Sequence, residues 1–259
     1  MHLSADQPLG FALLILVGAI ASGINAVAGG GTLVSFPVLT IPFGIVSKVA
    51  NATNSVGLWP GSLAGAWGFR NLYQQTAKQL QILFLPTLLG SALGAYLLIT
   101  TKQRLFDELI PALILLATAI LAFQPQIKKW VGSEHKKLPI WTGVVLQFLV
   151  AVYGGYFGAG MGIMMLATMA LTIDATVHEL NSLKNWLAVV INLVASTYFF
   201  IEHLILPLTA VALIIGALVG GYVGARVSQR FNPDKLRWAI VVYGVVMSIV
   251  FIKQAFFSS

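Results

Sequence analysis

The sequence predicts an all-α, polytopic membrane protein built from two inverted repeats, each with a glycine-broken helical hairpin and three spanning helices. Hydrophobic residues make up 58% of the 259 residues and charged residues only 9%, against about 25% charged residues in ordinary soluble domains. Apolar blocks close to the roughly 20 residues that a membrane-spanning helix needs recur along the whole chain. Motifs of the first half also return in the second half.

Apolar blocks between polar breaks predict five helical segments in each half. In the first half they cover residues 9–28, 32–42, 46–69, 80–99 and 105–123. In the second half they cover residues 139–156, 161–172, 180–201, 206–227 and 235–252. Most blocks are longer than the about 9 to 11 residues of barrel strands, which favours helices. We therefore predict a first repeat at 1–123, a cytoplasmic linker at 124–137 and a second repeat at 138–259.

The two halves share motifs as well as lengths. At offsets of 129 or 130 residues, these pairs coincide: Gly29 and Gly158, Gly31 and Gly160, Asn51 and Asn181, Gly90 and Gly220, and Gly94 and Gly224. An internal duplication of this kind is typical of secondary transporters.

The distribution of basic residues indicates the orientation. If the first two segments of each half enter the membrane and return to the same side, all but four of the 15 lysines and arginines lie on one side. The four exceptions are Lys48, Lys102, Arg104 and Lys253. A single crossing would divide the basic residues almost evenly. Because cytoplasmic loops are rich in lysine and arginine, the returning hairpin is favoured. The second half is then inverted, the linker is cytoplasmic and both chain ends lie outside.

The two glycine breaks are candidates for a transport path. The first break is Gly29, Gly30 and Gly31, followed by Thr32, and the second is Gly158, Ala159 and Gly160. Glycine costs about 1 kcal/mol relative to alanine inside a helix, so a clustered run marks a place where the backbone leaves the helix. The short helices that follow offer free N–H groups and a positive dipole end to an anion. Close helix packing is the alternative explanation of such glycines.

Polar side chains at the start of the third segment of each half form a second candidate feature. They are Asn51, Asn54 and Ser55 in the first half, and Asn181, Lys184 and Asn185 in the second. We expect them to lie near the breaks and to contact an anion, with Lys184 adding a charge-assisted hydrogen bond. The alternative is that the asparagines bind neighbouring backbone and that the lysine reaches toward lipid headgroups.

Several functional classes find no support in the sequence. The chain has no cysteine, which excludes disulfides and thiolate metal sites. It has no phosphate-binding loop of the Gly-xxxx-Gly-Lys-Ser/Thr form. No pair of histidine or acidic residues at helical spacing falls inside a predicted span, which argues against an intramembrane enzyme. We predict no cofactor, no metal and no nucleic-acid partner, and we interpret the net charge of +7 as an excess in cytoplasmic loops.

The chain resembles the TauE/SafE family of membrane permeases, the sulfite and organosulfonate exporters. The resemblance rests on the glycine-rich stretch at 25–37 with the polar motif at 51–55, and on their counterparts at 154–162 and 180–185. It implies a bacterial inner-membrane protein that exports sulfur-containing oxyanions. A secondary transporter for small anions, embedded in the lipid bilayer, is therefore the leading interpretation. An anion channel is the alternative that shares every one of these features.

Single cysteines placed at Ser133 and Ser259 test the inverted topology in this cysteine-free chain. The linker cysteine should react with a membrane-impermeant maleimide only from the cytoplasmic side, and the C-terminal cysteine only from the other side, because basic loops stay inside. Labelling in intact cells and in inverted vesicles measures both. Reaction of both cysteines from the same side contradicts the predicted topology.

Overall fold

The helices of the structure follow the predicted segments closely. In this computed structural model, residues 3–27, 29–132, 137–227 and 233–257 are described. They form α1 (Pro8–Val27), α2 (Thr32–Thr40), α3 (Ser47–Gly68), a short 3-10 turn η1 (Arg70–Leu72), α4 (Tyr73–Thr100), α5 (Gln103–Gly132), α6 (Ile140–Tyr156), α7 (Met161–Thr172), α8 (Val177–Ile201), α9 (Pro207–Val227) and α10 (Pro233–Phe257). The predicted all-α fold is confirmed, because the described residues contain no strand.

Six of the described helices are long and apolar enough to cross a membrane by length and composition, namely α1, α4, α5, α8, α9 and α10. Helix α3 has 22 residues, but its first half carries several polar side chains. Helices α2, α6 and α7 are shorter, with 9, 17 and 12 residues. The chain is therefore a multi-pass membrane protein. Two short helices of no more than 12 residues, α2 and α7, lie between its longer helices along the chain.

The boundary between the halves differs from the prediction in one respect. Helix α5 continues to Gly132, so the first nine residues of the predicted linker, 124–132, are helical. Pro125 lies inside this helix without ending it. Residues 133–136 of the predicted linker lie outside the described residues.

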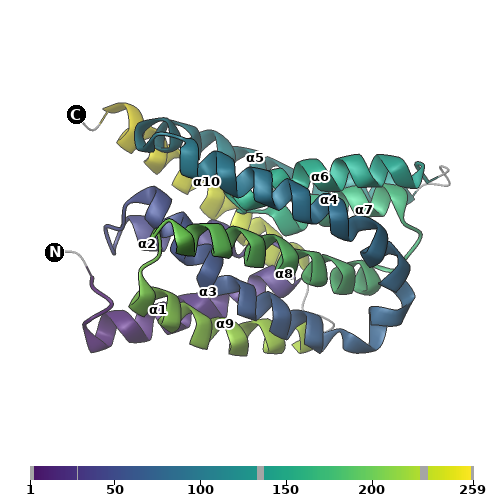
Figure 1. The fold of residues 1–259 in the computed structure, drawn as a ribbon, viewed down its shortest axis with the longest axis horizontal. Coiled ribbons are helices and arrows are strands. Elements are labelled where there is room, and N and C mark those ends of the chain that lie inside the picture. Colours follow the sequence, from purple (N-terminus) through teal and green to yellow (C-terminus); the bar gives the residue numbers. More distant parts are fainter. Residues whose placement is uncertain (1–2, 28, 133–136, 228–232, 258–259) are drawn as a thin grey trace.

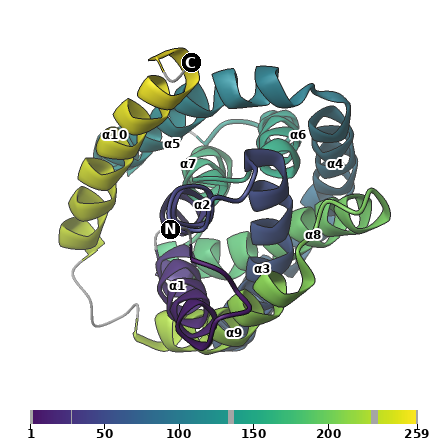
Figure 2. The same cartoon turned by 90° about the vertical axis from the view of Figure 1, so that its left-hand side faces the viewer.

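Both short helices return toward the side from which the preceding helix started. In the first half, the Leu3 N–H donates to the Pro42 carbonyl at 2.9 Å, which joins the residues before α1 to those after α2. In the second half, the Leu138 N–H donates to the Leu171 carbonyl at 3.0 Å, which joins the start of α6 to the end of α7. The pairs α1/α2 and α6/α7 are thus two hairpins of the same design. Figure 2 shows that α2 and α7 lie in the interior, surrounded by the longer helices.

Equivalent helices of the two halves pack against partners from the opposite half. Helix α4 packs on α6, and its counterpart α9 packs on α1. Glycines allow both contacts: a Cβ atom would lie 2.0 Å from the Val152 carbonyl oxygen at Gly94 and 1.9 Å from the Ala19 carbonyl oxygen at Gly220. No side chain fits such a space, so these glycines serve the close approach of two helices.

Helices α3 and α8 cross the centre in opposite directions. The Ser182 hydroxyl near the start of α8 donates to the Phe69 carbonyl just after α3, at 3.4 Å. After the end of α8, the Leu206 N–H donates to the Thr53 hydroxyl near the start of α3, at 3.1 Å. We call the end of the bundle that carries both chain termini the terminal face; α3 begins there and α8 ends there (Figure 1). The opposite end, where α6 and α8 begin, is the linker face.

Candidate functional site

The first glycine break meets the start of α7, which directly follows the second break, inside the bundle. Gly29 and Gly158 occupy the left-handed backbone region, with φ of 84° and 75°, which lets the chain reverse after α1 and after α6. A Cβ atom on Gly29 would lie 2.5 Å from the Gly162 carbonyl carbon and 2.7 Å from the Ile163 nitrogen. The first break therefore touches the first turn of α7. Because α2 runs toward the terminal face and α7 toward the linker face, two helix N-termini point at one interior region.

Lys184 of α8 lies against the first break. Its side chain is only 1% exposed. The ammonium donates to the carbonyl oxygens of Asn25 at 2.8 Å and Ala26 at 3.2 Å, and to Asn181 Oδ1 at 3.0 Å. Asn25 and Ala26 belong to the last turn of α1, where the helix leaves carbonyls unpaired and its dipole is negative. Lys184 thus caps a helix of the first half from a helix of the second half.

The charge of Lys184 has only neutral partners in the described part of the chain. Its three acceptors are two backbone carbonyls and one amide oxygen. The ion pair that the described residues form lies elsewhere, between Arg104 and Glu108 on the surface, at 3.0 Å. An ionised side chain inside a membrane protein is costly and is normally paired or functional. The site is therefore a buried basic group without an acidic partner among the described residues.

Two further groups, near Lys184 in the fold or in the sequence, can donate hydrogen bonds. The aliphatic stem of Lys184 borders Gly162, where an added Cβ would lie 3.3 Å from Lys184 Cδ. The backbone N–H of Gly162, in the first turn of α7, donates to no acceptor among the described residues. Asn185 is fully buried against Gly65 of α3, and neither its amide nitrogen nor its amide oxygen has a hydrogen-bond partner there. The charged side chain thus borders a helix start, and the unsatisfied amide of the next residue faces α3.

The polar group on α3 has the corresponding structural role in the other hairpin. Asn51 Nδ2 donates to the carbonyl of Tyr156, the last residue of α6, at 3.0 Å. The Ser55 hydroxyl bonds back to the Asn51 carbonyl at 3.0 Å. Asn54 is 1% exposed, and its amide oxygen has no hydrogen-bond partner in the described residues. Each hairpin's first helix is therefore capped by a side chain from the opposite half.

The four asparagines do not form one cluster. Because α3 and α8 run in opposite directions, Asn181 lies beside the end of α3, whereas Asn51 lies near its start. The roughly 18 residues from Asn51 to Phe69 extend about 27 Å at 1.5 Å per residue. The structure thus places Asn181, Lys184 and Asn185 toward the linker face and the group of Asn51, Asn54 and Ser55 toward the terminal face.

Packing explains several of the break glycines. At Gly31 an added Cβ would lie 1.8 Å from the Ala21 carbonyl oxygen, and at Gly160, which has a φ of 73°, 2.7 Å from Ala117 Cβ. Gly30 differs, because its nearest neighbours would be side-chain atoms at 3.5 Å or more. Ala159 is buried in the core, and Thr32 begins α2. Gly30 is therefore the break glycine with room beside it.

Tyrosines hold the hairpins in a way that the sequence analysis missed. The Tyr153 hydroxyl donates to the Ala159 carbonyl in the second break at 2.6 Å. The Tyr243 hydroxyl donates to the Val34 carbonyl in α2 at 3.5 Å. A tyrosine within an apolar span was the available signal, since a buried phenol needs an acceptor.

Discontinuous helices that meet inside a bundle of spans, beside a buried cation, are the architecture of a membrane transporter. The chain belongs to the TauE/SafE family: a family model described as "Sulfite exporter TauE/SafE" matches residues 14–251. The predicted membership is confirmed. No solved structure matches the chain significantly.

Similar proteins from several bacteria are named as transporters. A "Probable membrane transporter protein" of Haemophilus influenzae is 25% identical over 240 residues, which cover 92% of each chain. The "Probable membrane transporter protein YfcA" of Escherichia coli is 22% identical and covers 93% of this chain and 89% of its own. The "Probable membrane transporter protein YunE" of Bacillus subtilis is 20% identical and covers 96% of this chain and 100% of its own.

Two adjacent glycines test the packing of the first break. Gly31→Ala should destabilise the protein by about 1–3 kcal/mol, because its Cβ would collide with backbone that cannot move aside easily. Gly30→Ala should leave stability nearly unchanged, because the added methyl group meets only side-chain ends. Thermal unfolding of both variants in detergent measures the difference. Equal stability of the two variants contradicts this assignment.

Proposed function

We propose that the protein is a permease that exports a small anion, sulfite, an organosulfonate or a related sulfur oxyanion, across the bacterial inner membrane. The observation that carries the proposal is the buried ammonium of Lys184, which has no carboxylate partner in the described residues and lies where the first break touches the start of α7. The family description supports sulfur oxyanions as the substrate class. The relatives named above are called transporters without a stated substrate.

An oxyanion suits this group of donors. It has several oxygen atoms, each of which can accept hydrogen bonds, and Lys184 has three N–H donors. The start of α7 adds a partial positive charge and the Gly162 N–H. The amide of Asn185 can donate as well. We infer that the anion loses part of its water shell here and gains charge-assisted hydrogen bonds in exchange.

Binding of the anion would act on the first break. All three donors of the ammonium are engaged with Asn25, Ala26 and Asn181. An anion that takes one of these donors weakens the cap on α1, and the freed carbonyl then favours a rearrangement of the hairpin. The same contact thus recognises the substrate and loosens the helix end next to it, which is the coupling that an alternating-access cycle requires.

The proposed orientation makes export favourable without a second gradient. The returning hairpins support inverted repeats with the linker face in the cytoplasm, since this topology places most basic residues inside. A membrane potential is worth about 2.3 kcal/mol per elementary charge per 100 mV, and it drives anions outward when the interior is negative.

Flux into and out of liposomes tests the function directly. The purified protein should transport at least one of sulfite, thiosulfate, sulfate, methanesulfonate or sulfoacetate at a saturable rate under an imposed potential and without a pH gradient. Saturation separates a carrier from a channel, which would instead give single-channel currents. Absence of flux for all five compounds contradicts the proposed substrate class, and flux that needs a proton gradient contradicts the proposed driving force.

Lys184→Gln tests the role of the buried charge. We expect anion flux to fall by at least about tenfold, equivalent to about 1.4 kcal/mol, while Lys184→Arg keeps more of the flux because it keeps the charge. Lys48→Gln is the matched control: Lys48 also caps a helix end, through the Ile99 and Thr101 carbonyls at 3.1 and 2.8 Å, but away from the breaks. Equal flux in Lys184→Gln and the wild type, with both folded, contradicts the role of Lys184.

A further inference from the structure

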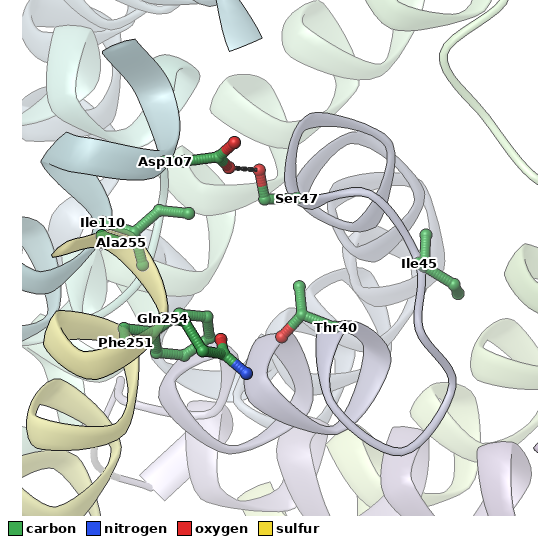
Figure 3. Close-up of a pocket in the computed structure, with 8 residues that line it drawn as sticks. All are labelled: Thr40, Ile45, Ser47, Asp107, Ile110, Phe251, Gln254 and Ala255. Carbon is green, nitrogen blue, oxygen red and sulfur yellow. Dashed lines mark hydrogen bonds between the residues drawn. The ribbon is translucent and has the colours of Figure 1, made fainter. Parts of the chain in front are cut away.

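A second polar site lies at the terminal face. A cavity of about 260 Å³ separates the ends of α2 and α10 from the starts of α3 and α5, and Figure 3 shows its lining. The lining residues are Thr40, Ile45, Ser47, Asp107, Ile110, Phe251, Gln254 and Ala255. Asp107 is the one charged residue among them. The cavity is therefore negative, in contrast to the region around Lys184.

The polar neighbours of Asp107 leave part of its carboxylate free. The Ser47 hydroxyl donates to Oδ1 of Asp107, and Gln103 Nε2 donates to the same oxygen at 2.9 Å and to Ser47 Oγ at 2.6 Å. The other carboxylate oxygen, Oδ2, accepts no hydrogen bond from the described residues. Both donors thus fix the orientation of the carboxylate without occupying its second oxygen.

Two basic side chains close to Asp107 or Ser47 in the sequence are engaged elsewhere. Arg104 pairs with Glu108 at 3.0 Å. Lys48, next to Ser47 in the sequence, donates to backbone carbonyls at the end of α4. Within the part of the chain that the structure describes, Asp107 therefore forms no ion pair. A partly buried carboxylate at the edge of a membrane span needs a positive partner.

The remaining groups around the cavity can offer oxygen atoms. Thr40 is the last residue of α2, so the cavity lies at the negative end of that helix dipole. The Thr40 hydroxyl donates to the Phe36 carbonyl at 3.1 Å, which leaves its own lone pairs available. Gln254 contributes an amide, across the cavity from Asp107 (Figure 3). Hard cations prefer such carboxylate, hydroxyl and amide oxygens.

We propose that this cavity binds one small monovalent cation of the sodium class, with Asp107 as the charged ligand and oxygens of Ser47, Thr40 and Gln254 completing the shell together with water. A single carboxylate matches a single positive charge, whereas divalent cation sites usually collect more ligand charge. The site needs no assumption about the transported anion.

Helix α2 links this cation site to the first break. Its nine residues span about 14 Å at 1.5 Å per residue, with Thr40 at the cavity and Thr32 beside the glycines. A cation bound at the C-terminal end of α2 would hold that end in place and so stabilise the hairpin that Lys184 caps at its other end. Cation occupancy and the conformation of the break are thereby connected through one short rigid element.

Sodium alone serves as the probe for the cation site. The purified full-length protein should become more stable to heat as NaCl replaces choline chloride at constant ionic strength, with a saturable dependence, because a ligand that binds only the folded state stabilises it. Asp107→Asn should raise the sodium concentration at half-effect by at least about tenfold, equivalent to about 1.4 kcal/mol. Glu202→Gln, an exposed acid at the same face, is the matched control and should behave as the wild type.

Line broadening of sodium-23 NMR, measured well below the unfolding temperature, gives a second readout. Ser47→Ala and Thr40→Val should each reduce the broadening, and they report on the site if Asp107→Asn does not fold. Equal stabilisation of the wild type by sodium and choline overturns the proposal. So does a folded Asp107→Asn variant whose sodium concentration at half-effect equals that of the wild type. A midpoint raised as much in Glu202→Gln as in Asp107→Asn overturns it too. None of these measurements involves anion transport, so they fail or succeed independently of the permease function.

Discussion

A helix that ends inside a membrane protein must find partners for the carbonyls it leaves unpaired, and the interior has no bulk water to supply them. The first helix of each hairpin, α1 or α6, meets this constraint in the same way. Lys184 of α8 caps α1 through Asn25 and Ala26, and Asn51 of α3 caps α6 through Tyr156. Each cap comes from the opposite half of the chain. Each hairpin is therefore completed by a side chain from the other half, and the two halves depend on each other for their least regular segments.

The close packing of the bundle follows from these crossed caps. A side chain of α8 reaches the end of α1 only if the intervening backbone is thin, and glycines provide this at the contact of Gly29 with Gly162. The same requirement recurs where α9 crosses α1 and where α4 crosses α6, at Gly220 and Gly94. A methyl group at these positions would separate the helices and pull the caps away from their carbonyls. The close packing at the glycines and the polar caps in the interior thus depend on each other. The break glycines therefore serve helix packing and the polar interior together.

The sequence was informative about local structure and less so about what meets across the interior. Apolar blocks and glycine runs predicted the helices to within a few residues at most ends, because burial in lipid requires long apolar segments. The sequence analysis did not predict that α5 continues through 124–132, because the polar residues there suggested a linker. Polar residues are also compatible with a helix that continues beyond the membrane. The hydrogen bonds from Lys184 of α8 to carbonyls of α1 join residues 158 and 159 positions apart in the sequence. They depend on tertiary packing that no local sequence pattern contains. Likewise, Asn51 and Asn181 share a motif but lie toward opposite faces, because the antiparallel crossing of α3 and α8 separates equivalent positions.

The motifs that recur in both halves preserve packing but not charge. At the offset of 130 residues, Lys184 corresponds to Asn54, and Arg237 corresponds to Asp107. Positive charge therefore lies toward the linker face and a carboxylate toward the terminal face, so the two halves of the interior have different electrostatic potentials. In a passive carrier this difference cannot set the net direction of transport, because the electrochemical gradient alone does so. It sets the affinity at each face instead. Under the proposed anion transport, the anion binds more tightly where Lys184 is accessible and leaves more readily where the neutral Asn54 takes its place. The protein then holds its substrate with an affinity that differs from one side of the membrane to the other.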